Sequence, residues 1–464
     1  GADDVKYLES IQSKQLEALV EKDLKGVANL ENRFTPALAY IEFCGFKLDR
    51  DKWKIKMDKD LAKLKEAEER LNQWIMDKGM SKYFTKQLSL FDPVACNINW
   101  NSSKQVIPLF EELGINCEVV EKGIRKKSIE ASNIEKQKSK STVVSLYLEY
   151  KKAEKVTSTY GENFLRQINK NTGRVHTQFK QIMDTGRISS GGKDKLTKEE
   201  YINFQNIPSD KETRACFVAE EGNILIISDY SGQEQIVLAN RALDPNLLKF
   251  YDEGLADMHS FVASKMYPEL EGLTLDEVKD KHKDKRQAAK SAGFAINYGG
   301  QGITIADNLG IPLEEGNKIY AAYFEAFPGL RNYFDTVKKQ GLRDGYVMIS
   351  PLTRRKSYID FFDKYKALEE ELTPEFWDRY RFAKSQDTPE FPSLKEKVSK
   401  YFMYKGDIER KTLNFPIQGS SAEITKISCI YILDYILDNE LQGIVKFVNT
   451  VHDENVLECP IEIS

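Results

Sequence analysis

Two apolar segments more than 200 residues apart end in acidic residues, and both have the pattern of β-strands. The segment "GNILIISDYSG" (222–232) is an apolar run that turns polar at Asp229, as a buried strand does where it leaves a sheet. The segment "GIVKFVNTVHDENVLEC" (443–459) reads as two apolar strands joined by a turn that holds Asp453 and Glu454. If these strands share a sheet, distant carboxylates meet at one edge of it.

A pair of carboxylates on neighbouring strand ends is a candidate site for Mg²⁺, which prefers hard oxygen ligands. Two such ions about 3.5–4 Å apart can activate an attacking oxygen and stabilise a leaving oxygen in phosphoryl transfer. Taken singly, an Asp at the end of a strand more often caps a turn. The carboxylates therefore need support from a second feature.

A second feature is the segment "RQAAKSAGFAINYGG" (286–300), which has charged or aromatic side chains at intervals of four. This spacing places Arg286, Lys290, Phe294 and Tyr298 on one face of a helix. The face is cationic at one end and aromatic at the other, which suits a nucleotide, part phosphate and part flat ring. A solvated first turn followed by a buried aromatic half remains the alternative from this stretch alone.

The rest of the chain is predicted to be mainly helical and to form several packed units, because 464 residues exceed one typical domain. Residues 356–408, rich in aromatic and charged side chains, read as an inserted region. The other expected elements are a long exposed helix at 51–79, an amphipathic helix within 97–115, a helix at 142–169, a hairpin at 171–179 and mostly helical residues at 232–345.

Charge is unevenly distributed along the chain. The net charge is −4, yet residues 122–155 hold ten Lys or Arg against four Glu, a local balance of +6. Clustered cations bind a nucleic-acid backbone, although a solvated helical face explains them equally well. The six cysteines form no CxxC pair and the four histidines form no HExxH motif, so the sequence favours a reducing compartment and a metal on oxygen ligands.

These motifs resemble those of family A DNA polymerases, the DNA polymerase I type. The segments "SDYSGQEQIVLA" (228–239), 286–300 and "TVHDENVLE" (450–458) are similar to the three polymerase motifs of that family, in the family's order. Further similar segments are "TGRVHTQFKQIMDTGRISS" (172–190), "NFQNIP" (203–208) and "ERKTLNFPIQGSSAEI" (409–424). The resemblance covers roughly residues 25–464. In the first motif Gly232 and Gln235-Ile236 depart from the family's usual Gln and Leu-Arg.

The resemblance implies an α+β, multi-domain, right-hand fold with an antiparallel-sheet palm, helical fingers and a helical thumb. Residues 1–24 would be a remnant of an exonuclease domain and a linker, with Asp4 at the place of a metal ligand. The implied parts are palm at 25–50, 169–235 and 411–464, thumb at 51–168, and fingers at 236–410 with the insertion at 356–408. The end of the palm at Ser464 is expected to be incomplete.

The resemblance also implies roles for individual residues. Asp229, Asp453 and the backbone carbonyl of Tyr230 would bind two Mg²⁺ ions, with Mn²⁺ as a substitute, and Glu454 would assist them or organise the primer end. Lys290 would bind the triphosphate and assist proton transfer to pyrophosphate. The remaining implied nucleotide contacts are Arg286, Phe294, Tyr298, Glu234 and His259, and the implied DNA contacts are Arg187, Asn203, Gln205, Arg410, Asn414, Gln418 and His452.

The resulting hypothesis is template-directed addition of dNTPs to a primer 3′-hydroxyl with release of pyrophosphate. Primer–template DNA, dNTPs and replication proteins are the expected partners, and the protein is expected to be an intracellular monomer, cytoplasmic or organellar, with no membrane association. The alternatives are a single-subunit RNA polymerase, a catalytically silent nucleic-acid-binding module and a two-metal nuclease. Glu234, beside C2′ of the sugar, speaks against the RNA polymerase.

Overall fold

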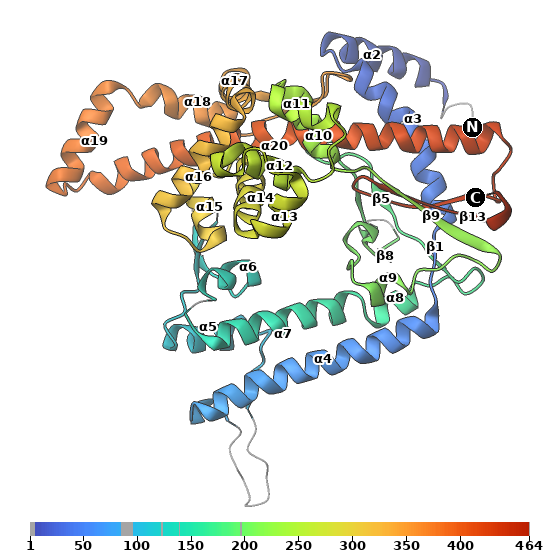
Figure 1. Cartoon of the computed structure of the whole chain (residues 1–464), viewed down its shortest axis with the longest axis horizontal. Helices are drawn as coiled ribbons and strands as arrows, with labels where there is room; N and C mark the ends of the chain where they lie inside the picture. Colours follow the sequence, from blue (N-terminus) through green and yellow to red (C-terminus); the bar gives the residue numbers. More distant parts are fainter. Residues whose placement is uncertain (1–4, 85–95, 122–123, 139, 195–196, 464) are drawn as a thin grey trace, which may run out of the picture. The chain divides into compact units, whose positions relative to one another are not determined.

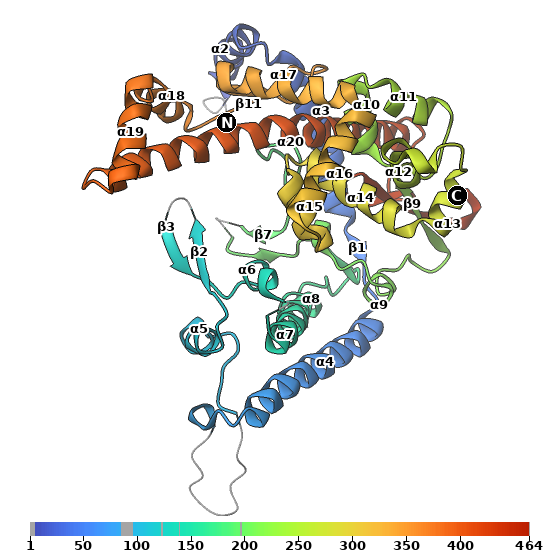
Figure 2. The same ribbon diagram turned by 60° about the vertical axis from the view of Figure 1, so that its left-hand side comes forward.

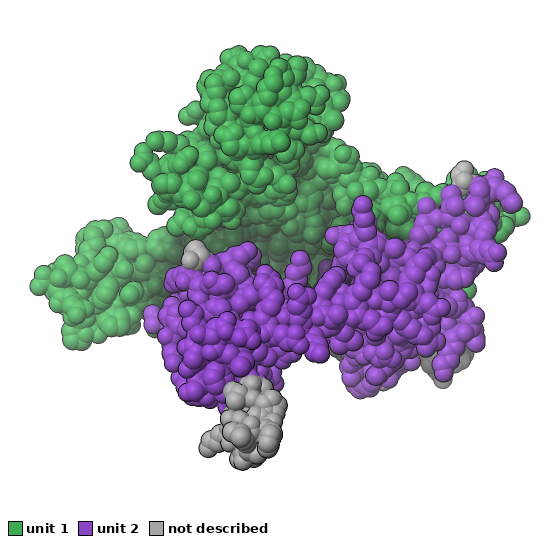
Figure 3. Space-filling view, turned by 60° about the horizontal axis from the view of Figure 1, so that its bottom comes forward, with its two compact units in different colours: residues 1–44, 178–191, 226–459 green, residues 45–177, 192–225, 460–464 purple. Residues whose placement is uncertain are grey.

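The computed structural model describes residues 5–84, 96–121, 124–138, 140–194 and 197–463 (Figure 1). They fall into two compact units (Figure 3). Each unit has its own hydrophobic core. Unit 1 comprises residues 1–44, 178–191 and 226–459, and unit 2 comprises residues 45–177, 192–225 and 460–464.

A three-stranded sheet carries the two acidic segments, with β13 (Glu454–Pro460) between β12 (Lys446–Val451) and β9 (Asn223–Asp229). β12 and β13 form an antiparallel hairpin whose last pair, Val451 with Glu454, closes a two-residue turn. β9 runs antiparallel to β13, because Tyr230 N–H donates to the Asp453 carbonyl while Ile461 N–H donates to the Gly222 carbonyl. The predicted strands at 222–232 and 443–459 are therefore confirmed.

Two helices of unit 1 pack together beside this sheet, namely α3 (Lys25–Cys44) and the 48-residue α20 (Phe391–Asp438) (Figure 1). Their shared core holds Phe34, Ile41, Cys429 and Phe447, all at most 1% exposed. Burial of this apolar surface removes it from water and fixes the sheet to the helices. The sheet edge with the carboxylates is thus anchored to α3 and α20 through this core.

The second half of unit 1 is a helical cluster around α14 (Lys283–Asn297). Buried side chains such as Phe261, Ala292 and Phe327 form its core, and Leu413 and Ile417 of α20 join it. The predicted helical character of 232–345 is confirmed. Its helices besides α14 are α10 (Gln233–Ala242), α11 (Pro245–Asp252), α12 (Met258–Met266), α13 (Leu275–Lys281), α15 (Gly302–Leu309), α16 (Leu313–Ala326) and α17 (Pro328–Asp344).

The segment 356–408 folds mainly into helices that continue into α20 (Figure 2). It begins with β11 (Lys356–Tyr358), which pairs antiparallel with β10 (Tyr346–Met348). α18 (Phe362–Glu371) and α19 (Pro374–Gln386) follow, and both pack on α20. Tyr365 is buried and stacks on Tyr401, with ring centroids 5.6 Å apart. The aromatic residues of this segment therefore serve packing at least in part.

Unit 2 is built around α4 (Arg50–Asp77), α5 (Ser103–Glu112) and α7 (Thr142–Thr159), and Trp100, Phe110 and Tyr147 lie in its core. Asp49 caps α4 by accepting the Asp51 and Lys52 N–H groups at 3.1 and 3.0 Å. The helices predicted at 51–79 and within 97–115 are confirmed.

The shorter elements complete the chain. In unit 2 they are β1 (Phe46–Lys47), β2 (Glu118–Glu121), β3 (Ile124–Lys127), α6 (Ala131–Ile134), α8 (Glu162–Arg166), β4 (Arg174–Val175), β7 (Gly192–Lys193), β8 (Glu200–Tyr201) and α9 (Lys211–Arg214), and in unit 1 they are α2 (Leu8–Glu21), β5 (Phe179–Lys180) and β6 (Ser189–Ser190).

Two expectations about unit 2 and its border are wrong. The helix predicted at 142–169 is divided into α7 and α8, because the chain turns at Gly161, a residue with low helix propensity. The hairpin predicted at 171–179 does not form, since β4 pairs with β1 and β5 pairs with β6. Local closure across the turn is limited to the bridge of Ile168 with Val175 and to backbone hydrogen bonds of Asn169 with Gly173 and Arg174, each 2.8 Å long. Pairing with distant segments overrides the local turn signal.

None of the helices within the described ranges is both long enough and apolar enough to cross a membrane.

Candidate active site

Asp229 and Asp453 lie side by side at one edge of the sheet. Asp229 is the last residue of β9, Asp453 lies in the turn between β12 and β13, and Tyr230 N–H donates to the Asp453 carbonyl at 3.3 Å. Burial, and next the charge of Asp229, raise the pKa of Asp453 above its ordinary value. This edge therefore concentrates negative charge that favours a cation.

The hairpin turn holds Asp453 in place through a constrained backbone. His452, its exposed first residue, has φ 55°, in the left-handed region that non-glycine residues rarely occupy. Behind the turn, Phe447 and Val448 are fully buried, so the strands cannot slip without exposing them. Glu454 follows as the first residue of β13 and is half-buried.

Glu234, on the first turn of α10, links three elements. One oxygen accepts a hydrogen bond from Tyr298 Oη at 3.0 Å, and the other forms a short ion pair with Arg187. Glu234 also lies close enough to Asp453 to help raise its pKa. The carboxylate edge is thus continuous with the end of α14.

The expected face of α14 exists, with Tyr298 immediately after the helix. Phe294 is 51% exposed and Tyr298 41% exposed, while Ala289, Ala292 and Ile296 bury the opposite side. Lys290 Nζ lies 6.0 Å from the centre of the Phe294 ring, within cation–π range. Aromatic rings this exposed are available to a ligand, so the alternative of a buried aromatic half is wrong.

His259 of α12 stands beside this face, with its ring centroid 6.1 Å from that of Phe294. Burial lowers its pKa, and the charges of Arg286 and Lys290 lower it further, although Asp257 opposes them. The ring is therefore mainly neutral at pH 7, and it offers a phosphate an N–H donor rather than a full positive charge.

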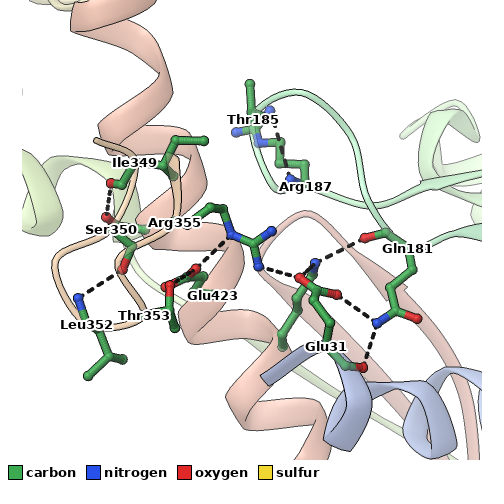
Figure 4. A network of polar contacts seen from close by, with 12 residues as sticks. Glu31, Gln181, Thr185, Arg187, Ile349, Ser350, Leu352, Thr353, Arg355 and Glu423 are labelled. Atoms are coloured by element: carbon green, nitrogen blue, oxygen red, sulfur yellow. Dashed lines mark hydrogen bonds and ion pairs between the residues drawn. The ribbon is translucent and has the colours of Figure 1, made fainter. Parts of the chain in front are cut away.

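The turn that carries Arg187 is held by a buried cluster of charges (Figure 4). Glu31 of α3 accepts from Lys426 Nζ at 2.6 Å and from Gln181 Nε2 at 2.7 Å, and it forms a short ion pair with Arg355. Arg355 Nε also donates to Glu423 Oε1 at 2.8 Å. All four charged residues are at most 7% exposed, so each charge depends on the others for compensation.

α20 presents the expected amides on one face and meets the Arg187 turn. Arg410, Asn414 and Gln418 are four residues apart; Arg410 is exposed and pairs with Asp407 at 3.0 Å, and the two amides are half-buried. At Gly419 a Cβ would lie 2.3 Å from the Thr185 carbonyl oxygen. Only glycine allows the turn to approach the helix this closely.

Asn203 and Gln205 belong to unit 2, whereas the residues above belong to unit 1. Asn203 Oδ1 accepts the Gln205 N–H at 2.9 Å and caps a short 3₁₀ turn. Gln205 is buried. Their joint action with the other site residues remains a prediction.

Sequence reasoning missed Asp257 and the buried cluster. Asp257 caps α12 and pairs with Arg286, and its signal was an Asp directly before the short helix that carries His259. The cluster had no sequence signal, because Glu31 and Lys426 are 395 positions apart. Asp4 lies outside the described residues.

Asp229, Asp453 and the Tyr230 carbonyl are the groups that could hold a metal at this edge. Throughout the described part of the chain, no group of three or more His, Cys, Asp or Glu side chains is arranged to hold a metal ion. Two carboxylates with a backbone carbonyl leave coordination positions for water and substrate oxygens, as Mg²⁺ commonly requires.

Paired carboxylates at a sheet edge, beside a helix with a cationic and aromatic face, are typical of enzymes that act on nucleotides. The chain belongs to DNA polymerase family A, since residues 75–463 match that family. It is 29% identical over 94% of its length to DNA polymerase I of Caldicellulosiruptor bescii, and 29% identical over 98% to DNA polymerase I of Bacillus subtilis. It spans 43% and 44% of these relatives, less than half their length.

A solved structure supports the same family. The POL domain of Pol1 from M. smegmatis, in complex with DNA primer-template and dNTP, superposes with a TM-score of 0.68 at 25% identity. The match covers 93% of this chain and 64% of that one. The expected family and the α+β, multi-domain polymerase fold with a small antiparallel sheet are confirmed.

Proposed function

We propose that the chain catalyses template-directed DNA synthesis, in which the primer 3′-hydroxyl attacks the α-phosphate of a dNTP and pyrophosphate leaves. The observation that carries this proposal is the continuity of the site in unit 1. Asp229 and Asp453 meet at the sheet edge, and Glu234 with Tyr298 joins that edge to the exposed face of α14. A relative with this fold holds primer-template and dNTP, which supports the same ligands here.

Asp229, Asp453 and the Tyr230 carbonyl would bind two Mg²⁺ ions, or Mn²⁺ in their place. The residues fit such ions, because the charge of Asp229 disfavours ionised Asp453 unless a cation compensates both. When bound, the ions supply charge stabilisation for the attacking and leaving oxygens. Glu454, half-buried beside Asp453, organises the primer end.

The face of α14 binds and orients the nucleotide. Arg286 and Lys290 neutralise the triphosphate, and Lys290 gives a proton to the departing pyrophosphate. His259 donates an N–H to the phosphates. Phe294 and Tyr298 pack around the sugar and the templating position, and together with Glu234 they form a wall beside C2′ that excludes a 2′-hydroxyl.

DNA is bound through polar groups that test the shape of the new base pair. Purine N3 and pyrimidine O2 are acceptors at similar places in the minor groove of every correct pair, so donors can check geometry without reading sequence. The basic stretch at 122–155 adds backbone affinity, although Lys122 lies outside the described residues. The proposed minor-groove and primer contacts are Arg187, Asn203, Gln205, Arg410, Asn414, Gln418 and His452.

The same proposal assigns the chain to palm, thumb and fingers domains. Palm segments are 25–50, 169–235 and 411–464, the thumb is 51–168, and the fingers are 236–410. Residues 1–24 lead into the palm. The protein acts as an intracellular monomer, cytoplasmic or organellar, with replication proteins as further partners.

Primer extension with a defined template, Mg²⁺ and either dNTPs or rNTPs tests the function. The chain is expected to extend with dNTPs and to use rNTPs poorly, whereas equal use of rNTPs supports a single-subunit RNA polymerase. Asp453→Asn is expected to lower extension by at least about 100-fold, because the site loses several kcal/mol of charge stabilisation, while DNA binding persists. Degradation of DNA without synthesis identifies a nuclease, and binding alone identifies a silent module.

Thermal unfolding tests the metal role apart from activity. A raised pKa in the folded state means that Asp453 stabilises the fold when protonated and loses this contribution as pH rises through that pKa. Above that pKa the charge of Asp453 is repelled by the charge of Asp229, so Asp453→Asn is expected to raise the Tm. Mg²⁺ is expected to raise the Tm of the unmodified protein more than that of Asp453→Asn. Equal responses to Mg²⁺ argue against the assigned ligand.

A further inference from the structure

Asp257 makes two kinds of contact with its carboxylate, one to its own helix and one to Arg286. Within α12, Oδ1 accepts the His259 and Ser260 N–H groups at 3.1 and 3.2 Å, and Oδ2 accepts the Ser260 hydroxyl at 2.7 Å. From α14, Arg286 Nε donates to Oδ2 at 3.0 Å and Nη2 donates to Oδ1 at 3.2 Å. Two parallel bonds of this kind fix a guanidinium in both position and orientation.

The environment keeps this carboxylate ionised. Asp257 is 19% exposed and Arg286 is 28% exposed, so water screens the pair only partly. Burial raises the pKa of Asp257, but the hydrogen bonds from Arg286 and Ser260 outweigh it and lower the pKa to about 2. The pair is therefore charged on both sides at any pH at which the protein would work.

The contact leaves Arg286 able to bind an anion. A guanidinium has five N–H donors, and Asp257 uses two of them, which leaves about three for other acceptors. An arginine side chain otherwise loses rotamer freedom when it is fixed by a ligand, and this loss weakens binding. Because Asp257 already restrains Arg286, part of this cost is met before a ligand arrives.

The same carboxylate positions a second group of the site. By capping α12 it sets the first turn of that helix, which carries His259. His259 and Lys290 both lie near the exposed ring of Phe294, at 6.1 and 6.0 Å. Asp257 thus links the cation of α14 and the imidazole of α12, the two elements that border the nucleotide face.

We propose that Asp257 is a positioning residue for the triphosphate of the incoming nucleotide, acting through Arg286 without touching the nucleotide. This inference depends on the proposed function, since it assigns Arg286 to the triphosphate. The opposite arrangement would make Asp257 a competitor that the triphosphate must displace. The two arrangements change the KM for dNTP in opposite directions.

The test is Asp257→Asn, which keeps the caps and breaks the ion pair. The Asn Oδ1 still accepts the two backbone N–H groups of α12 and the Nη2 donor of Arg286, whereas the amide NH₂ replaces Oδ2 and faces the Nε donor of Arg286. The KM for dNTP is expected to rise roughly 5- to 10-fold, and kcat to change less than about 2-fold, because a binding interaction shared by ground and transition states is weakened. Asp257→Ser, which also caps, is expected to show the same change.

Controls separate positioning from folding. Asp49→Asn makes the same change at the cap of α4, whose acceptor bonds are 3.1 and 3.0 Å, and it is expected to leave KM unchanged. Arg286→Ala provides a double-mutant cycle: if Asp257 acts through Arg286, then Asp257→Asn has no further effect on KM in the Arg286→Ala background. A Tm close to that of the unmodified protein shows that the α12 cap is intact.

The outcomes distinguish this inference from the proposed function. An unmodified chain that fails to extend a primer overturns the proposed function. An unmodified chain that extends normally, with a KM that is unchanged or lower in Asp257→Asn, overturns the positioning role alone. An equal rise of KM in the presence and absence of Arg286 also overturns it, since the effect then runs through another group.

Discussion

Glu234 is the residue on which the proposed choice of sugar depends. Its two oxygens are occupied by Tyr298 Oη at 3.0 Å and by the guanidinium of Arg187. A carboxylate held from both sides cannot easily swing aside for a 2′-hydroxyl, so a ribonucleotide would lose solvation or collide with it. The sequence predicted the wall, whereas the restraint by Arg187 is visible only in the structure.

Replacing Glu234 with Ala is expected to raise the use of rNTPs relative to dNTPs by roughly tenfold or more, because the wall beside C2′ is removed. The measurement is the ratio of kcat/KM for the two nucleotide types on one primed template. Asn240→Ala on the same helix is the control, since the Asn240 side chain donates to the Ile236 carbonyl of α10 itself. An unchanged ratio in Glu234→Ala would show that another group selects the sugar.

At the scale of elements, the turn with Arg187 is positioned by two contacts. The buried cluster fixes Gln181 at its start, through Lys426 and Glu31, and α20 receives Thr185 at Gly419. Met183 and Arg187 close the turn through a backbone hydrogen bond of 3.0 Å. The direction of the Arg187 side chain toward Glu234 follows from this packing.

Gly419→Ala is expected to lower the free energy of unfolding by about 2 to 3 kcal/mol, because its Cβ would lie 2.3 Å from a backbone oxygen. It is also expected to reduce primer extension by displacing Arg187. Gly406→Ala on the same helix is the matched control. Among the described residues its Cβ would meet the Arg410 guanidinium at 3.5 Å, an ordinary contact, so it is expected to stabilise α20 by up to about 1 kcal/mol. Urea denaturation and extension assays measure both effects.

The elements that sequence predicted well have a local signature. β9 is a continuous apolar run with a polar exit, and α4 has both an Asp cap and helical periodicity. β4 and β1 are two residues each and pair across more than 120 positions, so no periodic pattern could predict their partnership. Arg355 and Glu31, 324 positions apart, illustrate the same limit for side chains, since only the folded chain brings the two charges together.

At the scale of the whole molecule, the net charge does not indicate the basic surface that would bind DNA. The sum is −4, while Lys152 and Lys155 of α7 are exposed within a stretch of local balance +6. Affinity for DNA is therefore expected to fall steeply with salt in spite of the acidic total, since each phosphate contact releases condensed counterions.

The double substitution Lys152→Ala and Lys155→Ala is expected to reduce the slope of log affinity against log salt by up to about 1.8. Fluorescence anisotropy with a labelled primer–template at several salt concentrations gives this slope. Lys400→Ala removes an exposed lysine that already pairs with Glu396 at 2.7 Å, and it is expected to leave the slope unchanged. Equal slopes for the double variant and the unmodified protein would show that Lys152 and Lys155 of α7 do not contact DNA.

The position of Glu31 limits how far the chain can be shortened from its N-terminal side. Glu31 sits in α3 near the start of the chain, yet it neutralises Arg355 and Lys426, which are 324 and 395 positions further on. A fragment cloned to begin after α3 would bury two cations without their shared counter-ion, a defect that typically costs about 3 to 5 kcal/mol. The smallest stable fragment of unit 1 should therefore retain Lys25–Cys44, although that helix supplies none of the residues proposed to contact substrate.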